Sequence, residues 1–347
     1  MYKFLSEVFY ILGENKKKLP LLMLFLLLGS MLDLVGLGLI GPFIGLVINP
    51  EIILGNNKKI FDILGLPNEH KPLLVIFGVG LFVTFLLKSL TVLFINYKII
   101  RFCQDQCYYL RSLMMKTLQS ISYKDHINRN TSEYIHVIQT LSGHFSKGVV
   151  MSLLRIASES IVGISILIIL VWASGPILSV LVIILGIIVF GYDKIFKKKI
   201  KKYGSEINKS SIFTVGATQE GMDGFKEIRI LSKENYFHKR VREGAKKQAL
   251  FETKNDMLKI APKYILEFLM VSFFVFLILG FILLEKDLNI ILPTIGIFGV
   301  VALRLIPSAN NFSNSLSMLR VYHDSVNRLF KDLNSFKKIS KENLTIK

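Results

Sequence analysis

Polar side chains recur on one helical face near the end of the last strongly apolar stretch of the chain. The residues on this face are Arg304, Ser308, Asn311 and Ser315. Spacings of four, seven and eleven residues from the arginine place them all on one side of a helix. Pro307 should kink that helix, because it removes a backbone hydrogen bond. An arginine can donate two parallel hydrogen bonds to a phosphate, so this face predicts a site for a phosphate-bearing or pyrophosphate-bearing group.

Two further cations lie in apolar surroundings. Lys88 is inside the second apolar stretch, and Lys263 opens the fifth. A charged side chain at the centre of a membrane helix costs about 2.5–3.5 kcal/mol on insertion scales, so it normally faces a cavity or a partner. Both lysines would add point charges for the same anion if they lined one chamber with Arg304. The predicted substrate cavity is therefore Arg304, Lys88, Lys263, Ser308 and Asn311.

Internal charge pairing is the alternative to a charged chamber. Carboxylates also occur in apolar stretches, at Asp33 in the first, Glu159 in the third and Glu267 in the fifth. Arg155 precedes Glu159 by four residues, and Lys263 precedes Glu267 by four, which is the spacing of neighbours on a helix. These pairs would neutralise the cations without any ligand, so both interpretations stay open.

The elements that carry these side chains are apolar helices. The chain is 52% hydrophobic with a mean hydropathy of +0.50, above the roughly 45–50% apolar content of soluble domains. Windows of about 20 apolar residues, enough to cross a bilayer as helix, occur at 19–48, 72–97, 149–172, 176–192, 264–284 and 288–312. The division of the stretch from 149 to 192 rests on the turn-forming sequence WASGP. The sequence predicts an all-α, six-span membrane protein.

Basic residues predict the orientation of these spans. Segments 1–18, 98–148, 193–263 and 313–347 hold 36 of the 43 lysines and arginines, so we expect them, and both termini, in the cytoplasm of a multi-pass inner-membrane protein. The net charge of +18 then reflects this asymmetry and attraction to anionic lipid headgroups. The charges bracket apolar runs instead of forming one soluble basic face, which argues against a nucleic-acid partner.

Few residues suggest chemistry of any other kind. Cys103 and Cys107 are four residues apart and are expected to be reduced thiols, because nothing nearby completes a metal site. The six histidines have no ligand spacing. No nucleophile–base or metal constellation is evident, so we expect no catalytic residues and no metal on this chain.

Two cytoplasmic excursions have the same plan. In 98–148 and 193–263 an apolar helix continues past the membrane, a turn-forming tip follows, and a second helix returns, with Thr131 or Ser132 as the expected N-cap of the first return. Twenty extra helical residues would reach about 30 Å from the bilayer. Two such hairpins suit contact with another domain, although a merely solvated stalk is the alternative.

The remaining segments lie at the edges of the six-span domain 19–312. Residues 1–18 have apolar side chains at helical spacing and end in three lysines, which predicts an amphipathic helix at the inner membrane surface. Residues 49–71 suggest a small amphipathic helix on the outer leaflet or a packed loop cap. Residues 313–347 are expected to form a cytoplasmic helical tail.

The second tip resembles that of type IV ABC exporters. In that family a short coupling helix is followed by a glycine, a K-E-I-like step and a K-E-x-x-F ending. The matching residues in ATQEGMDGFKEIRILSKENYFHKRV are Gly224, Phe225, Lys226, Glu227, Ile228, Lys233, Glu234 and Phe237. The first tip, SYKDHINRNTSEYIHVI, is similar to the first coupling helix of the family.

The last span resembles a narrower group, the PglK-type flippases of lipid-linked oligosaccharides. Their R-L-x-P-S-A-N motif is present as Arg304, Leu305, Pro307, Ser308, Ala309 and Asn310. The amphipathic external segment and the GPF of Gly41–Phe43 fit the same group. One departure is Asn311, which stands where this group tends to carry another basic residue.

The resemblance implies a homodimer of two six-helix halves with long cytoplasmic extensions, worked by ATP–Mg on nucleotide-binding domains. The residues that would couple the halves to those domains are Tyr123, Asp125, Asn130, Gln219, Glu220, Asp223 and Phe225. The sequence contains no G-x-x-x-x-G-K-[ST] phosphate loop and no LSGGQ-like signature. We therefore expect no cofactor on this chain, and an ATPase domain that is associated with it or missing from it.

The expected function is translocation of a lipid-linked oligosaccharide or a related pyrophosphate lipid across the inner membrane. Export of another lipid, a peptide or a drug by the same architecture is the first alternative. The second is a membrane scaffold or degenerate subunit without a motor, which the missing ATPase alone favours.

Overall fold

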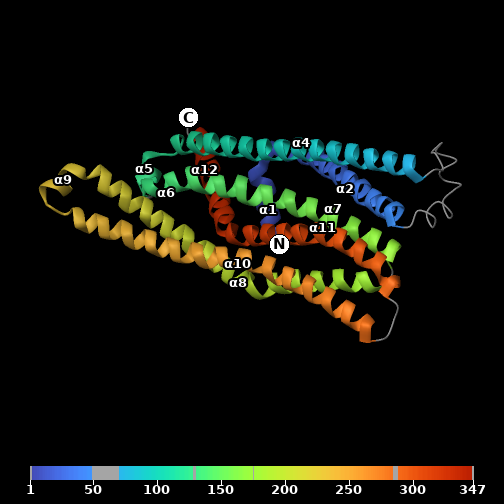
Figure 1. The fold of residues 1–347 in the computed structure, drawn as a ribbon. Coiled ribbons are helices and arrows are strands. Elements are labelled where there is room, and N and C mark those ends of the chain that lie inside the picture. The colour runs from blue at the N-terminus through green and yellow to red at the C-terminus, as the bar shows by residue number, and fades with distance from the viewer. Residues whose placement is uncertain (1, 49–69, 128–129, 175, 284–287, 346–347) are drawn as a thin grey trace.

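The structure is a computed structural model in which residues 2–48, 70–127, 130–174, 176–283 and 288–345 are described. These residues are helical with short connections, and no strand occurs among them. The amphipathic segment expected at 49–71 lies almost wholly outside the described residues. Figure 1 shows the helices as an elongated bundle with one long hairpin that extends beyond the rest.

Six long helices in the described residues contain the six predicted spans to within two residues at the span ends. They are α2 (Leu19–Ile48), α4 (His70–Gln119), α7 (Met151–Ser174), α8 (Pro176–Asp223), α10 (Glu234–Leu283) and α11 (Leu288–Val321). The break expected at WASGP is confirmed between α7 and α8, where Pro176 occupies a first helical position that needs no N–H partner. The all-α fold class is therefore confirmed.

Length and hydropathy single out three helical stretches among the described residues as able to cross a membrane. These are Pro72–Gln119, Thr131–Ser165 and Glu234–Gly280. The other three predicted spans, in α2, α8 and α11, include residues whose side chains are not described. At 1.5 Å per residue a helix of 50 residues, such as α4 or α10, is about 75 Å long, so it exceeds the ~30 Å hydrocarbon core by a wide margin.

The tips of the two excursions that the sequence predicts to be cytoplasmic are short helices (Figure 1). The first consists of α5 (Tyr123–Ile127) and the start of α6 (Thr131–His136), which continues through the wide turns η2 (Val137–Leu141) and η3 (His144–Val150) into α7. The second is α9 (Phe225–Ile230), between α8 and α10. The expectation that Thr131 or Ser132 caps α6 is wrong: the Asn130 side chain accepts from the Ser132 N–H at 3.1 Å.

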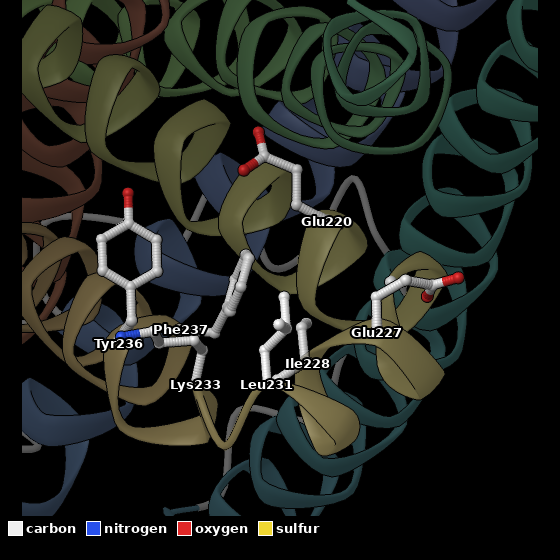
Figure 2. Close-up of a pocket in the computed structure, with 8 residues that line it drawn as sticks. Glu220, Glu227, Ile228, Leu231, Lys233, Tyr236 and Phe237 are labelled. Atoms are coloured by element: carbon white, nitrogen blue, oxygen red, sulfur yellow. The ribbon is translucent and has the colours of Figure 1, made fainter.

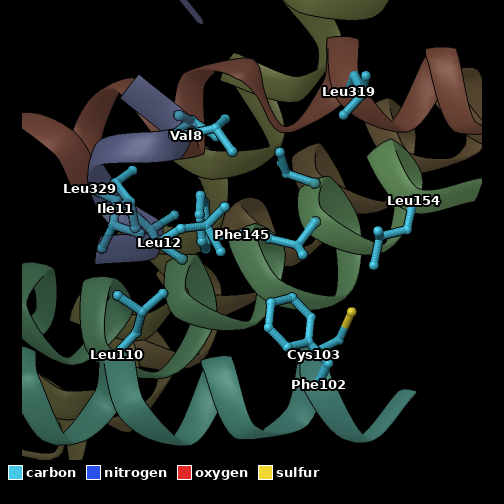
Figure 3. Close-up of a cluster of buried hydrophobic side chains, with 14 of the residues drawn as sticks. Val8, Ile11, Leu12, Phe102, Cys103, Leu110, Phe145, Leu154, Leu319 and Leu329 are labelled. Atoms are coloured by element: carbon cyan, nitrogen blue, oxygen red, sulfur yellow. The ribbon is translucent and has the colours of Figure 1, made fainter. Parts of the chain in front are cut away.

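The hydrophobic core lies where α1 (Tyr2–Leu12) meets α4, the helix returning from the first tip, and α12 (His323–Thr345) (Figure 3). From α1, Val8, Ile11 and Leu12 are at most 2% exposed. The apolar side of the predicted interfacial helix is thus covered by protein. That α1 lies on the inner membrane surface stays a prediction.

The C-terminal segment is packed into the same core. Residues 313–321 continue α11, Tyr322 forms a turn, and α12 then crosses the bundle with Val326, Leu329 and Leu333 buried. The predicted helical tail is therefore two pieces, one in line with α11 and one folded against α1, α4 and α8. That it leads to a nucleotide-binding domain stays a prediction.

Two glycines allow the close approach of the turn at Tyr322. A Cβ atom at Gly148 would overlap the Tyr322 ring, and one at Gly204 would overlap the carbonyl oxygen of Val321. The Tyr322 ring also stacks on His144, with centroids 4.4 Å apart. Both positions therefore exclude any larger residue while the turn keeps this conformation.

Polar contacts hold the turn against α8. Arg320 donates two hydrogen bonds to Asp193, at 3.2 and 2.9 Å. The Asn208 amide donates to Asp324 Oδ2 at 3.0 Å. Burial, with nearby cations, lowers the pKa of His323, so its ring is neutral near pH 7 and stacks on Phe4 at 5.1 Å. The end of α11 is thus fixed to α8 and α1 together.

We predict that Gly148→Ala destabilises the protein by about 1–3 kcal/mol, because the added methyl group displaces Tyr322 from its stack. Thermal unfolding in detergent should show a lower apparent melting temperature. Gly143→Ala is the control. Gly143 lies just before η3, the segment that contains Gly148, and no atom lies within 4 Å of a Cβ added there. That variant should be neutral or more stable by up to about 1 kcal/mol. Equal melting temperatures for the two variants would contradict this account of the turn.

Candidate substrate chamber and coupling tips

The polar face of α11 meets a carboxylate of α7. The Ser308 hydroxyl donates to Glu159 Oε2 at 2.5 Å, and the Asn311 amide donates to Glu159 Oε1 at 3.0 Å. Ser308 is only 4% exposed. Both oxygens of Glu159 are therefore used to join α7 to α11, and two of the predicted cavity residues are brought together by this contact.

The structure does not pair Glu159 with Arg155. Glu159 accepts from α11, and Arg155 is exposed. Asp33, another candidate counter-ion, has a side chain outside the described part of the chain. Arg304 lies one helical turn before Ser308 and is partly buried, with its Nε atom shielded from solvent. This arginine therefore does not extend freely from the outer surface of the bundle.

The two lysines of the predicted cavity come from other helices. Lys88 on α4 is partly buried, with its Nζ 4.8 Å from the centroid of the Phe85 ring. Its Cδ lies 3.8 Å from the Cβ position of Gly36, so the side chain lies beside α2. Lys263 on α10 is 47% exposed and forms an ion pair with Glu267 at 3.8 Å. For Lys263 the internal pairing is thus observed, and a chamber shared by all three cations stays a prediction.

The second tip exposes an apolar surface. Five of its large hydrophobic side chains are more than half exposed: Met222, Phe225, Ile230, Leu231 and Tyr236. Figure 2 shows the adjoining groove, about 560 Å³ in volume, in which Ile228, Leu231 and Phe237 lie together. Glu220, Glu227 and Lys233 add charge to its lining. Such a surface at the end of a protruding hairpin suits a protein partner.

An arginine that the sequence did not single out closes this hairpin. Arg240 on α10 forms an ion pair with Glu220 on α8, and its guanidinium lies over the rings of Phe213 and Tyr236, at 5.5 and 5.7 Å. Glu220, predicted to couple the tip to another domain, is therefore engaged within its own chain. Arg240 does lie within the tip sequence ATQEGMDGFKEIRILSKENYFHKRV, and that position is the signal that could have located it.

The other predicted coupling residues differ in exposure. On the second tip Asp223 and Phe225 are exposed, and Gln219 is partly buried. On the first tip Tyr123 is 80% exposed, and Asn130 is used as the cap of α6. Asp125 lies in α5, and its side chain is outside the described part. Tyr123, Asp223 and Phe225 are thus the predicted tip residues that are most accessible to a partner.

Comparison with known proteins assigns this architecture to a family. Residues 19–301 match the family model of the ABC transporter transmembrane region. The chain belongs to this family. An ABC transporter transmembrane region lies in a membrane, so the chain is a membrane-spanning part of a transporter, in agreement with its apolar helices.

A solved structure similar to this ABC transporter domain is that of a bacterial Atm1-family ABC exporter with ATP bound. The TM-score is 0.63 at 15% sequence identity, over 95% of this chain and 54% of the other. The chain thus spans about half the length of that exporter. At this identity the likeness concerns the fold, and it supports the assignment of α2 to α11 as an exporter-type bundle.

We predict that Glu159→Ala destabilises this ABC transporter domain by about 1–3 kcal/mol, because the buried Ser308 hydroxyl loses its acceptor. Glu267→Ala is the control: it removes the half-exposed pair with Lys263, a contact of the kind worth about 0.3–0.5 kcal/mol. Melting curves in detergent should separate the two variants. A loss as large for Glu267→Ala as for Glu159→Ala would argue against the role given to Glu159.

Proposed function

We propose that the chain is the transmembrane half of an ATP-driven ABC exporter or flippase that translocates a lipid-linked oligosaccharide or a related pyrophosphate lipid. It works as a homodimer in the inner membrane, with both termini in the cytoplasm. The observation that carries the substrate class is Arg304, a shielded cation one turn from the Glu159 contact on the last span of a membrane transporter. The R-L-x-P-S-A-N resemblance around it points to the same class.

The cations suit a pyrophosphate group that passes between the helices. Arg304 would bind it as a bidentate donor, and Lys88 would contribute a point charge. The Lys263–Glu267 pair is long, at 3.8 Å, and about half exposed, so it is weak and an entering anion can displace the carboxylate. The lipid tail stays in the bilayer while the headgroup follows the polar route.

The motor would bind at the two tips. The exposed apolar side chains around Phe225, together with Tyr123 on the first tip, would contact a nucleotide-binding domain that holds ATP–Mg. Because the Arg240–Glu220 pair closes the hairpin of α8 and α10, closure of the ATP-bound domains would move the hairpin as one body. The chamber would then alternate between inward and outward access by rigid-body movement.

Arg304→Ala tests the substrate class. In vesicles that contain the transporter and its ATPase, flipping of a pyrophosphate-linked lipid should fall at least about tenfold, because a hydrogen bond to a charged group is worth about 1.5–3 kcal/mol. Arg304→Lys should retain part of the activity, since it keeps the charge and loses the bidentate geometry. Unchanged flipping by Arg304→Ala would remove the pyrophosphate proposal and favour a different cargo.

Phe225→Asp tests the motor contact. The charge should abolish association with the nucleotide-binding domain, measured as co-purification of that domain and as its ATP hydrolysis in the complex. Leu250→Asp is the control, because Leu250 is also half exposed, at 52%, on the same hairpin but away from α9. Retention of the ATP-binding domain by Phe225→Asp, at the level of the Leu250 control, would rule out docking at this tip.

A further inference from the structure

One backbone carbonyl inside α10 has no donor within its own helix. Pro262 lies in the interior of α10 and is buried. Proline has no N–H group, so the carbonyl four residues earlier, that of Leu258, cannot form its helical hydrogen bond. A shielded carbonyl needs another partner, because leaving it unpaired is unfavourable.

The missing donor is a tyrosine of α8. The Tyr192 hydroxyl donates to the Leu258 carbonyl at 2.8 Å, across 66 positions of sequence. Tyr192 is 8% exposed, and its ring packs on that of Phe196, one helical turn away, at 4.5 Å. This packing orients the hydroxyl toward α10. The acceptor is therefore the one carbonyl of the helix that the proline leaves without an N–H partner.

We propose that the Tyr192–Leu258 hydrogen bond is a latch over the interruption that Pro262 makes in α10. The hydroxyl takes the place of the absent N–H and holds the interrupted part of the helix against α8. Tyr192 is thereby a positioning residue for the movement of the α8–α10 hairpin. The role in transport rests on the proposed function, whereas the latch itself does not.

The latch lies where both helices leave the membrane. Tyr192 closes the fourth apolar stretch, and Pro262 lies two residues before the fifth. Nearer the tip the two helices pack tightly: a Cβ at Gly244 of α10 would overlap Thr214 of α8. This close approach and the Arg240–Glu220 pair hold the outer part of the hairpin together, so in this proposal the hairpin bends at Pro262.

A side-chain latch differs from a backbone hydrogen bond in how it can open. A tyrosine hydroxyl can separate from the carbonyl by a small shift of α8, and the rest of the α10 ladder stays intact. With a backbone N–H at position 262 the same opening would require a break in the helix. Pro262 and Tyr192 together therefore make a joint that is rigid when bonded and able to bend when released.

A double-mutant cycle tests the latch on the full chain in detergent. Tyr192→Phe should lower the apparent melting temperature by at least about 2 °C, because the carbonyl loses its donor. Pro262→Ala restores an N–H to that carbonyl, so Tyr192→Phe should have little effect in this background. Amide exchange should quicken around residues 258–262 in Tyr192→Phe and slow again in the double variant.

Tyr203→Phe is the matched control. Tyr203 is also on α8 and contacts α10 through its ring, which lies 5.8 Å from that of Phe251. Its variant should leave the melting temperature unchanged in both backgrounds. The latch would be overturned if Tyr192→Phe lowered the melting temperature equally in the natural and Pro262→Ala backgrounds, or lowered it in neither.

The role in transport has a separate readout. In vesicles with the ATPase present, Pro262→Ala should flip lipid at least about fivefold more slowly although it unfolds no more easily, because the joint can no longer open. Natural flipping rates for Pro262→Ala would overturn the role in movement. The double-mutant melting experiment needs neither cargo nor ATP. If it gives the expected result while the natural protein flips no lipid, the proposed function is overturned and the Tyr192–Leu258 latch is not.

Discussion

A bilayer core offers no water to hydrogen-bond a polar group, so each N–H, C=O and hydroxyl within it must be satisfied by the protein itself. Most of this requirement is met by the α-helix, which pairs its own backbone. The constraint is evident where a polar group has no partner within its own helix. Within the spans, Glu159 accepts from two side chains of α11. Where α8 and α10 leave the apolar stretches, the same need of a shielded carbonyl is met by Tyr192, which donates to the carbonyl that Pro262 deprives of an N–H donor. These polar exceptions decide which helices are joined.

Apolar packing also holds these helices together. The hydrophobic core unites α1, α4, the helix that returns from the first tip, and α12. Two glycines let the turn at Tyr322 approach this core closely, and Arg320 and Asn208 fix it to α8. The end of the last span is therefore tied to the start of the chain and to the fourth span. Movement of α11 cannot be independent of either.

The sequence predicted most of the fold, because spans and tips are local features. Hydropathy located six helices, and turn-forming residues located both tips. The cap of α6 was misplaced because Asn130, Thr131 and Ser132 are all cap-forming residues in a row, and helix ends vary by one or two positions. The amphipathic pattern of α1 predicted an apolar face correctly, but it cannot tell a lipid surface from a protein one.

The candidate site was less predictable, since it depends on which helical faces meet. The polar stripe after Arg304 was evident, yet its contact with Glu159 joins residues 149 positions apart. Spacing alone favoured Arg155 as the neighbour of that carboxylate. Arg240 lies 20 residues from Glu220, and only the closed hairpin brings the two together. Tertiary packing selected partners that local periodicity could not.

The packing of α1 on α12 has a consequence for biogenesis. Val8, Ile11 and Leu12 are synthesised well before α12, which helps to cover them and emerges more than 300 residues later. At about 5–20 residues per second the delay is roughly 15–60 s. During that interval the apolar side of α1 lacks the cover that α12 gives it in the folded protein. If α1 binds the inner membrane surface, as its amphipathic pattern predicts, it exchanges lipid contacts for protein contacts once α12 has been synthesised.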